Sequence, residues 1–163
     1  MWFDAHGDVQ TLETTTSGYL GGMPLRMLVR YRPELMARPL GLRPVAERQV
    51  ALVDARDLDP PELSYLERSE IRRLRVEDVH ARDLPDGPIY LHVDIDVVDP
   101  AELPGLRFPA PDGPGLDAVA AALHRVRKTG RVAALGLACT WHAGHGAAAV
   151  MRPHLANLIE NWE

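Results

Sequence analysis

The sequence predicts an α/β fold in which a mainly parallel β-sheet lies between two layers of helices. Short apolar runs, typical of buried strands, alternate along the chain with segments whose apolar residues recur at helical spacing. This alternation is typical of a parallel sheet with helices on both faces. Acidic residues follow two of the apolar runs, at the strand ends where such proteins bind ligands. The 163 residues are expected to form a single domain.

The predicted strands are apolar runs bounded by polar or turn-forming residues. They cover residues 1–4, 50–55, 89–94 and 132–139. The stretch from Gly7 to Gly22 is rich in polar and turn-forming residues, and residues 32–48 contain several prolines, so both are predicted loops.

Helices are predicted between and after these strands. Pro24 suits the first turn of a short helix that runs to about Tyr31. Asp59 is a predicted N-cap with Glu62 three residues later, and we expect this helix to carry its apolar face as far as Leu74. The last two helices are predicted from spaced apolar residues: Leu116, Val119, Leu123 and Val126, and then Met151, Leu155, Leu158, Ile159 and Trp162.

Composition and charge narrow the functional classes. The net charge of -5 and the absence of a Lys/Arg block argue against a nucleic-acid surface. No apolar stretch is long enough to span a membrane, and the N-terminus does not resemble a signal peptide. The single cysteine, Cys139, excludes an internal disulfide and fits a reducing compartment, so a cytoplasmic protein is expected.

Two motifs carry acidic residues at alternate positions. Asp4, His6 and Asp8 can converge if the chain curls over as it leaves its strand, because alternate strand residues share one face. Asp94 and Asp96 end the apolar run of a second strand in the same way. Buried carboxylates are costly unless a positive charge lies between them. Carboxylates with an imidazole suit manganese or a similar divalent ion, whereas zinc sites more often use several His or Cys ligands.

The motifs allow two interpretations. Two metal ions held about 3.5–4 Å apart could bridge one water and lower its pKa toward neutrality. Either motif alone is more often a solvated loop than a site. Their joint occurrence at the ends of predicted parallel strands favours the metal site.

The same motifs resemble those of the arginase, agmatinase and formiminoglutamase (ureohydrolase) family. Asp4 to Asp8 reads as the family's Asp-Ala-His-x-Asp signature. Further resemblances follow in the family's order: Ser17–Pro24 to a Ser-Gly-Asn-x-His-Gly-Met-Pro loop, Ala55–Glu62 to an Arg-Asp-x-Asp-Pro-x-Glu segment, Val93–Pro100 to an Asp-x-Asp-x-x-Asp-Pro motif, and Phe108–Gly113 to a proline-rich loop.

This resemblance implies an arginase-like three-layer α/β/α fold and a binuclear manganese hydrolase of linear amidine or guanidino C–N bonds. Asp4 and Asp94 would bridge the two ions, His6 and Asp96 would bind one ion, and Asp8 would bind the other. His6 and Asp8 are also the residues assigned to catalysis. The expected partner is a small-molecule amidine or guanidino substrate, and a homo-oligomer is expected.

The resemblance also places Ser17, Asp59 and Glu62 where the family contacts the far end of its substrate. For Asp59 and Glu62, a plain helix start is an equal alternative. The family's proton-shuttling histidine aligns with Gly21, and its guanidinium-pairing glutamate aligns with Cys139. Because a neutral thiol cannot pair with a guanidinium as a carboxylate does, the expected substrate is not arginine.

The family carries one more metal-binding histidine, in a strand upstream of this sequence. The chain is therefore expected to be the C-terminal part of the family fold, incomplete at its N-terminus, with one ion short of a ligand or absent. His142 and His145 could replace the lost groups or could be solvated loop residues. His92 could face the site or lie in the core. The alternative functions are a catalytically silent family member acting in binding or assembly, and a deacetylase-like hydrolase.

Overall fold

The computed structural model of the chain describes residues 1–160. The side chains of Leu155, Asn157, Leu158 and Glu160 lie outside this description, as do residues 161–163. The predicted apolar face of the closing helix therefore lies partly outside the described structure, at the side chains of Leu155 and Leu158 and at Trp162.

The centre of the fold is a five-stranded sheet in the order β3-β2-β1-β4-β5, with all pairings parallel. The short strand β1 lies in the middle, where Trp2 pairs with Leu52 on one side and with His92 on the other. The strands are β1 Trp2–Phe3, β2 Ala51–Val53, β3 Arg72–Leu74, β4 Ile89–Asp94 and β5 Val132–Ala138.

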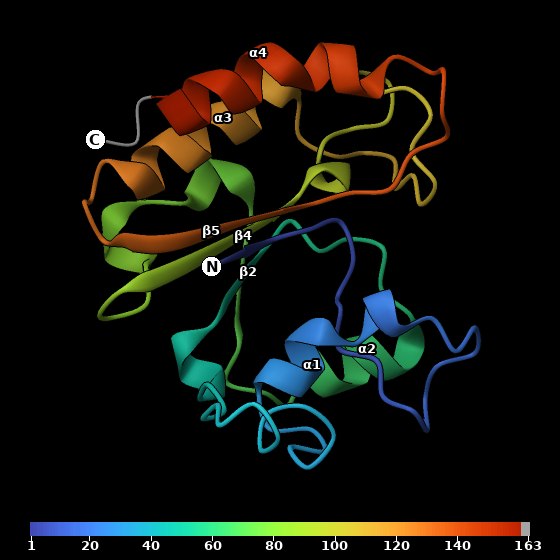
Figure 1. Cartoon of the computed structure of the whole chain (residues 1–163), viewed down its shortest axis with the longest axis vertical. Coiled ribbons are helices and arrows are strands. Elements are labelled where there is room, and N and C mark those ends of the chain that lie inside the picture. Colours follow the sequence, from blue (N-terminus) through green and yellow to red (C-terminus); the bar gives the residue numbers. More distant parts are fainter. Residues whose placement is uncertain (161–163) are drawn as a thin grey trace.

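Helices cover both faces of the sheet, as predicted. Figure 1 shows α3 and α4 on one face and α1 and α2 on the other. The helices are α1 Pro24–Leu28, α2 Pro60–Leu66, α3 Leu116–Arg127 and α4 Ala147–Glu160. Short 3₁₀ turns occupy Leu20–Gly22, Glu47–Gln49, Val76–Asp78, Ala81–Asp83 and Ile95–Val97. The three-layer α/β/α architecture is confirmed.

Strand alternation divides the core in two. Phe3 and Leu91 lie in the hydrophobic cluster that includes residues of α3 and α4, whereas Trp2 and Leu52 lie in the cluster that includes residues of α1 and α2. In β4, Tyr90, His92 and Asp94 alternate with buried apolar residues and are more exposed than these. The polar residues of β4 thus lie on the face of the sheet opposite α3.

The structure corrects two predicted elements. Helix α2 ends at Leu66, and Leu74, predicted on its apolar face, instead lies in the edge strand β3. The segment forms a strand because it hydrogen-bonds along the backbone of β2. For example, the Arg72 amide donates to the Val50 carbonyl at 3.1 Å. In α4, Met151 is buried as predicted, but Ile159 is 52% exposed.

Candidate metal centre

A cavity of about 560 Å³ opens at the carboxyl end of β1 and β4. Its size is typical of small-molecule sites. Every residue predicted from the sequence to bind metal or substrate lines it: Asp4, His6, Asp8, Ser17, Asp59, Glu62, Asp94 and Asp96. Residues far apart in the sequence therefore share one site at the strand ends, as expected of an open α/β sheet.

The first motif curls over the end of β1, as predicted. The Asp4 carboxylate accepts hydrogen bonds from the His6 backbone amide at 2.7 Å and from the Trp2 indole N–H at 3.3 Å. The same indole donates to Asp8 at 3.2 Å. Asp8 has a φ of 53°, a left-handed conformation that turns the chain back toward the strand end. Asp4 and Asp8 are both buried, so this curl places two carboxylates side by side away from water.

The second motif bends in a 3₁₀ turn directly after β4. The Asp94 carboxylate accepts a hydrogen bond from the Asp96 backbone amide at 3.1 Å, which caps this turn. The turn brings Asp96 back over the sheet, where its carboxylate lies 3.3 Å from Nδ1 of His6. Nδ1 of His6 also lies 3.2 Å from the Asp4 carboxylate. One imidazole nitrogen therefore lies between carboxylates from both motifs.

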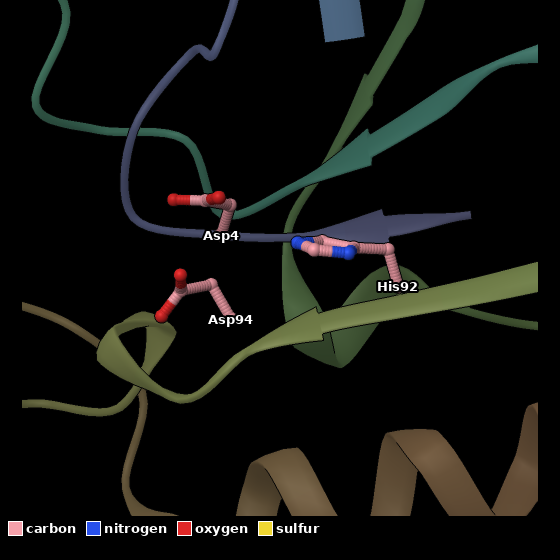
Figure 2. A group of neighbouring side chains, drawn as sticks. All are labelled: Asp4, His92 and Asp94. Atoms are coloured by element: carbon pink, nitrogen blue, oxygen red, sulfur yellow. The ribbon is translucent and has the colours of Figure 1, made fainter. Parts of the chain in front are cut away.

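Two groups of side chains in this cavity have the geometry to hold a metal ion. One consists of Asp4, His6 and Asp96, and the other of Asp4, His92 and Asp94. Within each group the potential ligand atoms lie within 4.8 Å of one another. Figure 2 shows the second group, with the His92 ring extending from β4 toward the two carboxylates. Because the groups share Asp4, their donor sets fit two neighbouring divalent cations.

The carboxyl groups titrate as expected of acids buried together. Burial first, and then the charge of Asp4, raise the pKa of Asp8 to about 10. Burial, with the charges of Asp96 and Asp4, raises the pKa of Asp94 to about 7. Without a metal ion, Asp8 therefore keeps its proton at neutral pH, whereas Asp94 is close to its titration midpoint.

The two histidines shift in opposite directions. Burial lowers the pKa of His6, but hydrogen bonds and charges from Asp4 and Asp96 outweigh burial and raise it to about 11. Burial, with the positive charge of the N-terminal amino group, lowers the pKa of His92 to about 4. His6 thus acts as a cation between carboxylates, whereas the imidazole of His92 is neutral.

Lysine and arginine do not neutralise the acids of the cavity. Within the part of the chain that the structure describes, no Lys or Arg forms an ion pair with Asp4, Asp8, Asp94 or Asp96. The nearby Arg56 guanidinium donates instead to backbone carbonyls, including Val97 at 3.0 Å and Ala110 at 2.7 Å. Arg56 therefore fixes the loops around the cavity instead of pairing with these carboxylates.

The predicted substrate contacts fall into two kinds. Ser17 is exposed on the loop at the cavity wall. Glu62 is buried, and its carboxylate accepts the backbone amides of Asp59 at 3.1 Å and Val9 at 3.2 Å. Asp59 accepts a hydrogen bond from the Gln10 amide at 2.7 Å. Asp59 and Glu62 therefore connect the start of α2 to the loop that follows Asp8.

The residues that depart from the family pattern also lie at the cavity. Gly21 and Cys139 line it. Burial and the charges of Asp94 and Asp96 raise the pKa of the Cys139 thiol, so the thiol is neutral. His142 and His145 are exposed and are not among the lining residues, which agrees with solvated loop histidines.

The protein is an α/β protein with a parallel sheet. The cavity at the carboxyl edge of this sheet is lined by acids and histidines that have the geometry to hold a metal ion. Comparison with known families is more specific, because the model of the Arginase family matches residues 1–139. The chain belongs to this family. Among the helices of residues 1–160, each is too short or too polar to cross a membrane.

Curated relatives are similar over most of this chain but over less than half of their own length. The arginase of Bacillus subtilis is 35% identical over 127 residues, which cover 69% of this chain and 43% of the relative. The N(omega)-hydroxy-L-arginine amidinohydrolase of Streptomyces lavendulae is 33% identical over 117 residues, covering 69% of this chain and 41% of the relative.

Solved structures show the same fold. The arginase of Bacillus caldovelox superposes with a TM-score of 0.82 at 24% identity, covering 96% of this chain and 58% of the other. A formimidoylglutamase from Bacillus subtilis gives a TM-score of 0.68 at 18% identity, covering 98% of this chain and 52% of the other. The predicted arginase-like fold class is confirmed.

Proposed function

We propose that this protein is a metal-dependent ureohydrolase that hydrolyses a linear amidine or guanidino C–N bond with two manganese ions. The observation that carries the proposal is the pair of donor groups, Asp4-His6-Asp96 and Asp4-His92-Asp94, in one cavity. Membership of the Arginase family and the names of its relatives support the reaction class. Oxygen-rich donors with few nitrogens suit manganese.

The roles that we propose for the individual residues are those that the family resemblance implies. Asp4 and Asp94 would be shared between the ions, His6 and Asp96 would hold one ion, and Asp8 would face the other. A pair of divalent ions lowers the pKa of water and so supplies a nucleophile near neutral pH. The Trp2 indole N–H, which donates to both Asp4 and Asp8, fixes the orientation of these carboxylates.

The substrate we propose is an amidine or guanidino compound other than arginine. Cys139 lines the cavity with a neutral thiol, which cannot form the paired charged hydrogen bonds that a carboxylate offers a guanidinium. Tyr19 and Phe108 also line the cavity with rings 5.4 Å apart, and both side chains are substantially exposed. These aromatic residues favour a substrate with an apolar part over a small, fully polar one.

The test is turnover of a panel of amidine and guanidino compounds by the manganese-loaded protein, measured as release of urea or ammonia. Asp94→Asn should lower turnover of any accepted compound at least about 100-fold, because several kcal/mol of metal-derived stabilisation would be lost. Asp78→Asn, which changes an exposed carboxylate on a distant 3₁₀ turn, should leave turnover unchanged. Absence of turnover in protein that carries its metal would contradict the proposal and favour the catalytically silent alternative.

A further inference from the structure

One member of the two donor groups, His92, has not yet been assigned a role of its own. His92 lies in β4 two residues before Asp94, so both side chains lie on the same face of the sheet. Its imidazole joins Asp4 and Asp94 in a group whose ligand atoms lie within 4.8 Å of one another. The other donor group already contains its own histidine, His6. His92 thus stands where a nitrogen ligand for a second ion is needed.

The environment of His92 holds the ring in one orientation. The ring stacks on Trp2 with centroids 3.6 Å apart and planes at 16°. The Tyr90 hydroxyl lies 3.5 Å from Nδ1 of His92. In Figure 2 one ring nitrogen occupies the end of the ring that points toward Asp4 and Asp94. With Nδ1 beside Tyr90, this leading nitrogen is Nε2, which is free to bind a metal.

Trp2 couples this ring to the acids. The face of the Trp2 ring stacks on the ring of His92. The indole N–H of Trp2 donates to Asp4 at 3.3 Å and to Asp8 at 3.2 Å. A single buried side chain therefore positions three potential ligands of one ion. Metal-binding histidines and carboxylates are generally oriented in this way by neighbouring groups, which fix ring orientation and raise affinity.

We propose that His92 is the nitrogen ligand of the second manganese ion, which it binds through Nε2 together with Asp4 and Asp94. This inference rests on the proposed function, since it assigns a ligand within that metal site. It gives the second ion an imidazole ligand from β4, with Asp8 as a nearby carboxylate in the same cavity. The two ions would then have matching donor sets, each with one imidazole and a share of Asp4.

The test measures manganese binding, not activity. The full chain is titrated with Mn²⁺ while the signal of free Mn²⁺ is followed by electron paramagnetic resonance. His92→Phe keeps an aromatic ring stacked on Trp2 but removes both ring nitrogens. His92→Asn also removes the imidazole but adds no new ring, so an effect shared by both variants cannot come from the packing of phenylalanine. The matched control is His124→Asn, which changes an exposed histidine on α3.

We expect two ions per chain in the wild type and in His124→Asn. Both His92 variants should retain one ion and bind the second at least about tenfold more weakly, since loss of even an outer partner of a ligand costs that much. Pulsed electron paramagnetic resonance detects a nitrogen atom bound to Mn²⁺ as a modulation of the signal. This modulation should persist in His6→Ala, where His92 still supplies a nitrogen, and it should vanish in the double variant His6→Ala/His92→Phe.

Two results would overturn the assignment in different ways. If both His92 variants bind two ions with wild-type affinity, His92 is not a ligand, although the proposed function stands. If the wild type binds no manganese, the proposed function fails and this inference fails with it.

Discussion

At the scale of single residues, the site is dominated by carboxylates that no Lys or Arg of the described residues neutralises. Asp4 and Asp8 accept the same indole N–H of Trp2, and Asp4 and Asp96 approach the same nitrogen of His6. An arrangement of this kind is unfavourable without a cation, because desolvation and mutual repulsion both disfavour the ionised acids. The cost should be visible in the stability of the metal-free protein.

We predict that the metal-free protein loses stability between pH 8 and 10. Asp8, with its pKa raised to about 10, keeps a proton in the folded state that the unfolded chain has already released. His6, with its pKa raised to about 11, behaves in the same way, and its stabilising charge is lost as the pH rises toward that value. The folded state therefore binds more protons than the unfolded chain. For each additional proton bound, the free energy of unfolding falls by up to about 1.4 kcal/mol for every unit by which the pH rises.

Thermal melts in EDTA across this range test the prediction, with Asp8→Asn as the decisive variant. Asparagine cannot ionise, so the variant should show a shallower decline of Tm and exceed the wild type at the upper end of the range. Added Mn²⁺ should raise the Tm of the wild type by mass action. A wild-type Tm that stays constant from pH 8 to 10 without metal would contradict this account of Asp8 and His6.

At the scale of secondary structure, the site depends on how loops are tied to the elements around them. Glu62 lies in the first turn of α2, and both of its carboxylate oxygens accept backbone amides. One of these amides belongs to Val9, the residue after Asp8. The start of α2 therefore holds the curled loop in place beneath the cavity.

We predict that Glu62→Ala destabilises the protein by about 1–3 kcal/mol, because two backbone amides, one of them on the buried Val9, lose their acceptor. It should also weaken manganese binding, since Asp8 is no longer held at the cavity. Glu67→Ala removes an exposed carboxylate at the other end of α2 and should change neither property. Urea unfolding and metal titration of the two variants give the comparison. Equal effects of the two substitutions would mean that Glu62 only begins a helix.

The sequence predicts those elements whose pattern is local. The apolar runs of β1 and β2 are recognisable because both faces of these strands are buried, and those of β4 and β5 are recognisable from their apolar composition. Strand β3 was missed, because Arg72 and Arg73 are exposed and the segment forms a strand only by pairing with β2. Its identity depends on a neighbour distant in the sequence.

The candidate site was predictable to a similar extent. Alternation and family resemblance indicated that Asp4, His6 and Asp8 converge, and that Asp94 and Asp96 lie at the same site. The role of His92 could not be decided, because alternation places a histidine on a face but does not tell how deep its ring reaches. The stacking on Trp2, which directs the ring toward Asp4, is a tertiary contact.

At the scale of the whole molecule, the two hydrophobic clusters lie on opposite faces of the same strands. Adjacent residues of β1, Trp2 and Phe3, belong to different clusters. We therefore propose that residues 1–163 form one domain that unfolds cooperatively. The edge of the sheet at β5 is less protected, since Ala133, Ala134 and Leu137 are exposed there.

We propose that this edge promotes self-association, because an unpaired strand edge offers backbone groups to a second chain. The wild type should sediment as an oligomer at micromolar concentration. Ala133→Lys places a charge on the edge strand and should shift the distribution toward monomer, whereas Ala118→Lys, at an exposed position of α3, should not. A wild type that sediments as a monomer over the whole concentration range would contradict the proposal.

The central claim is that the acids at the carboxyl edge of the sheet hold divalent cations, and Asp4 is the residue that both donor groups share. Its most direct test is the manganese content of the chain and of Asp4→Ala, measured by elemental analysis after dialysis against excess Mn²⁺ and removal of free metal. The account predicts two ions per chain in the wild type and none in Asp4→Ala. A wild type without manganese, or an Asp4→Ala variant that retains as much as the wild type, would contradict it.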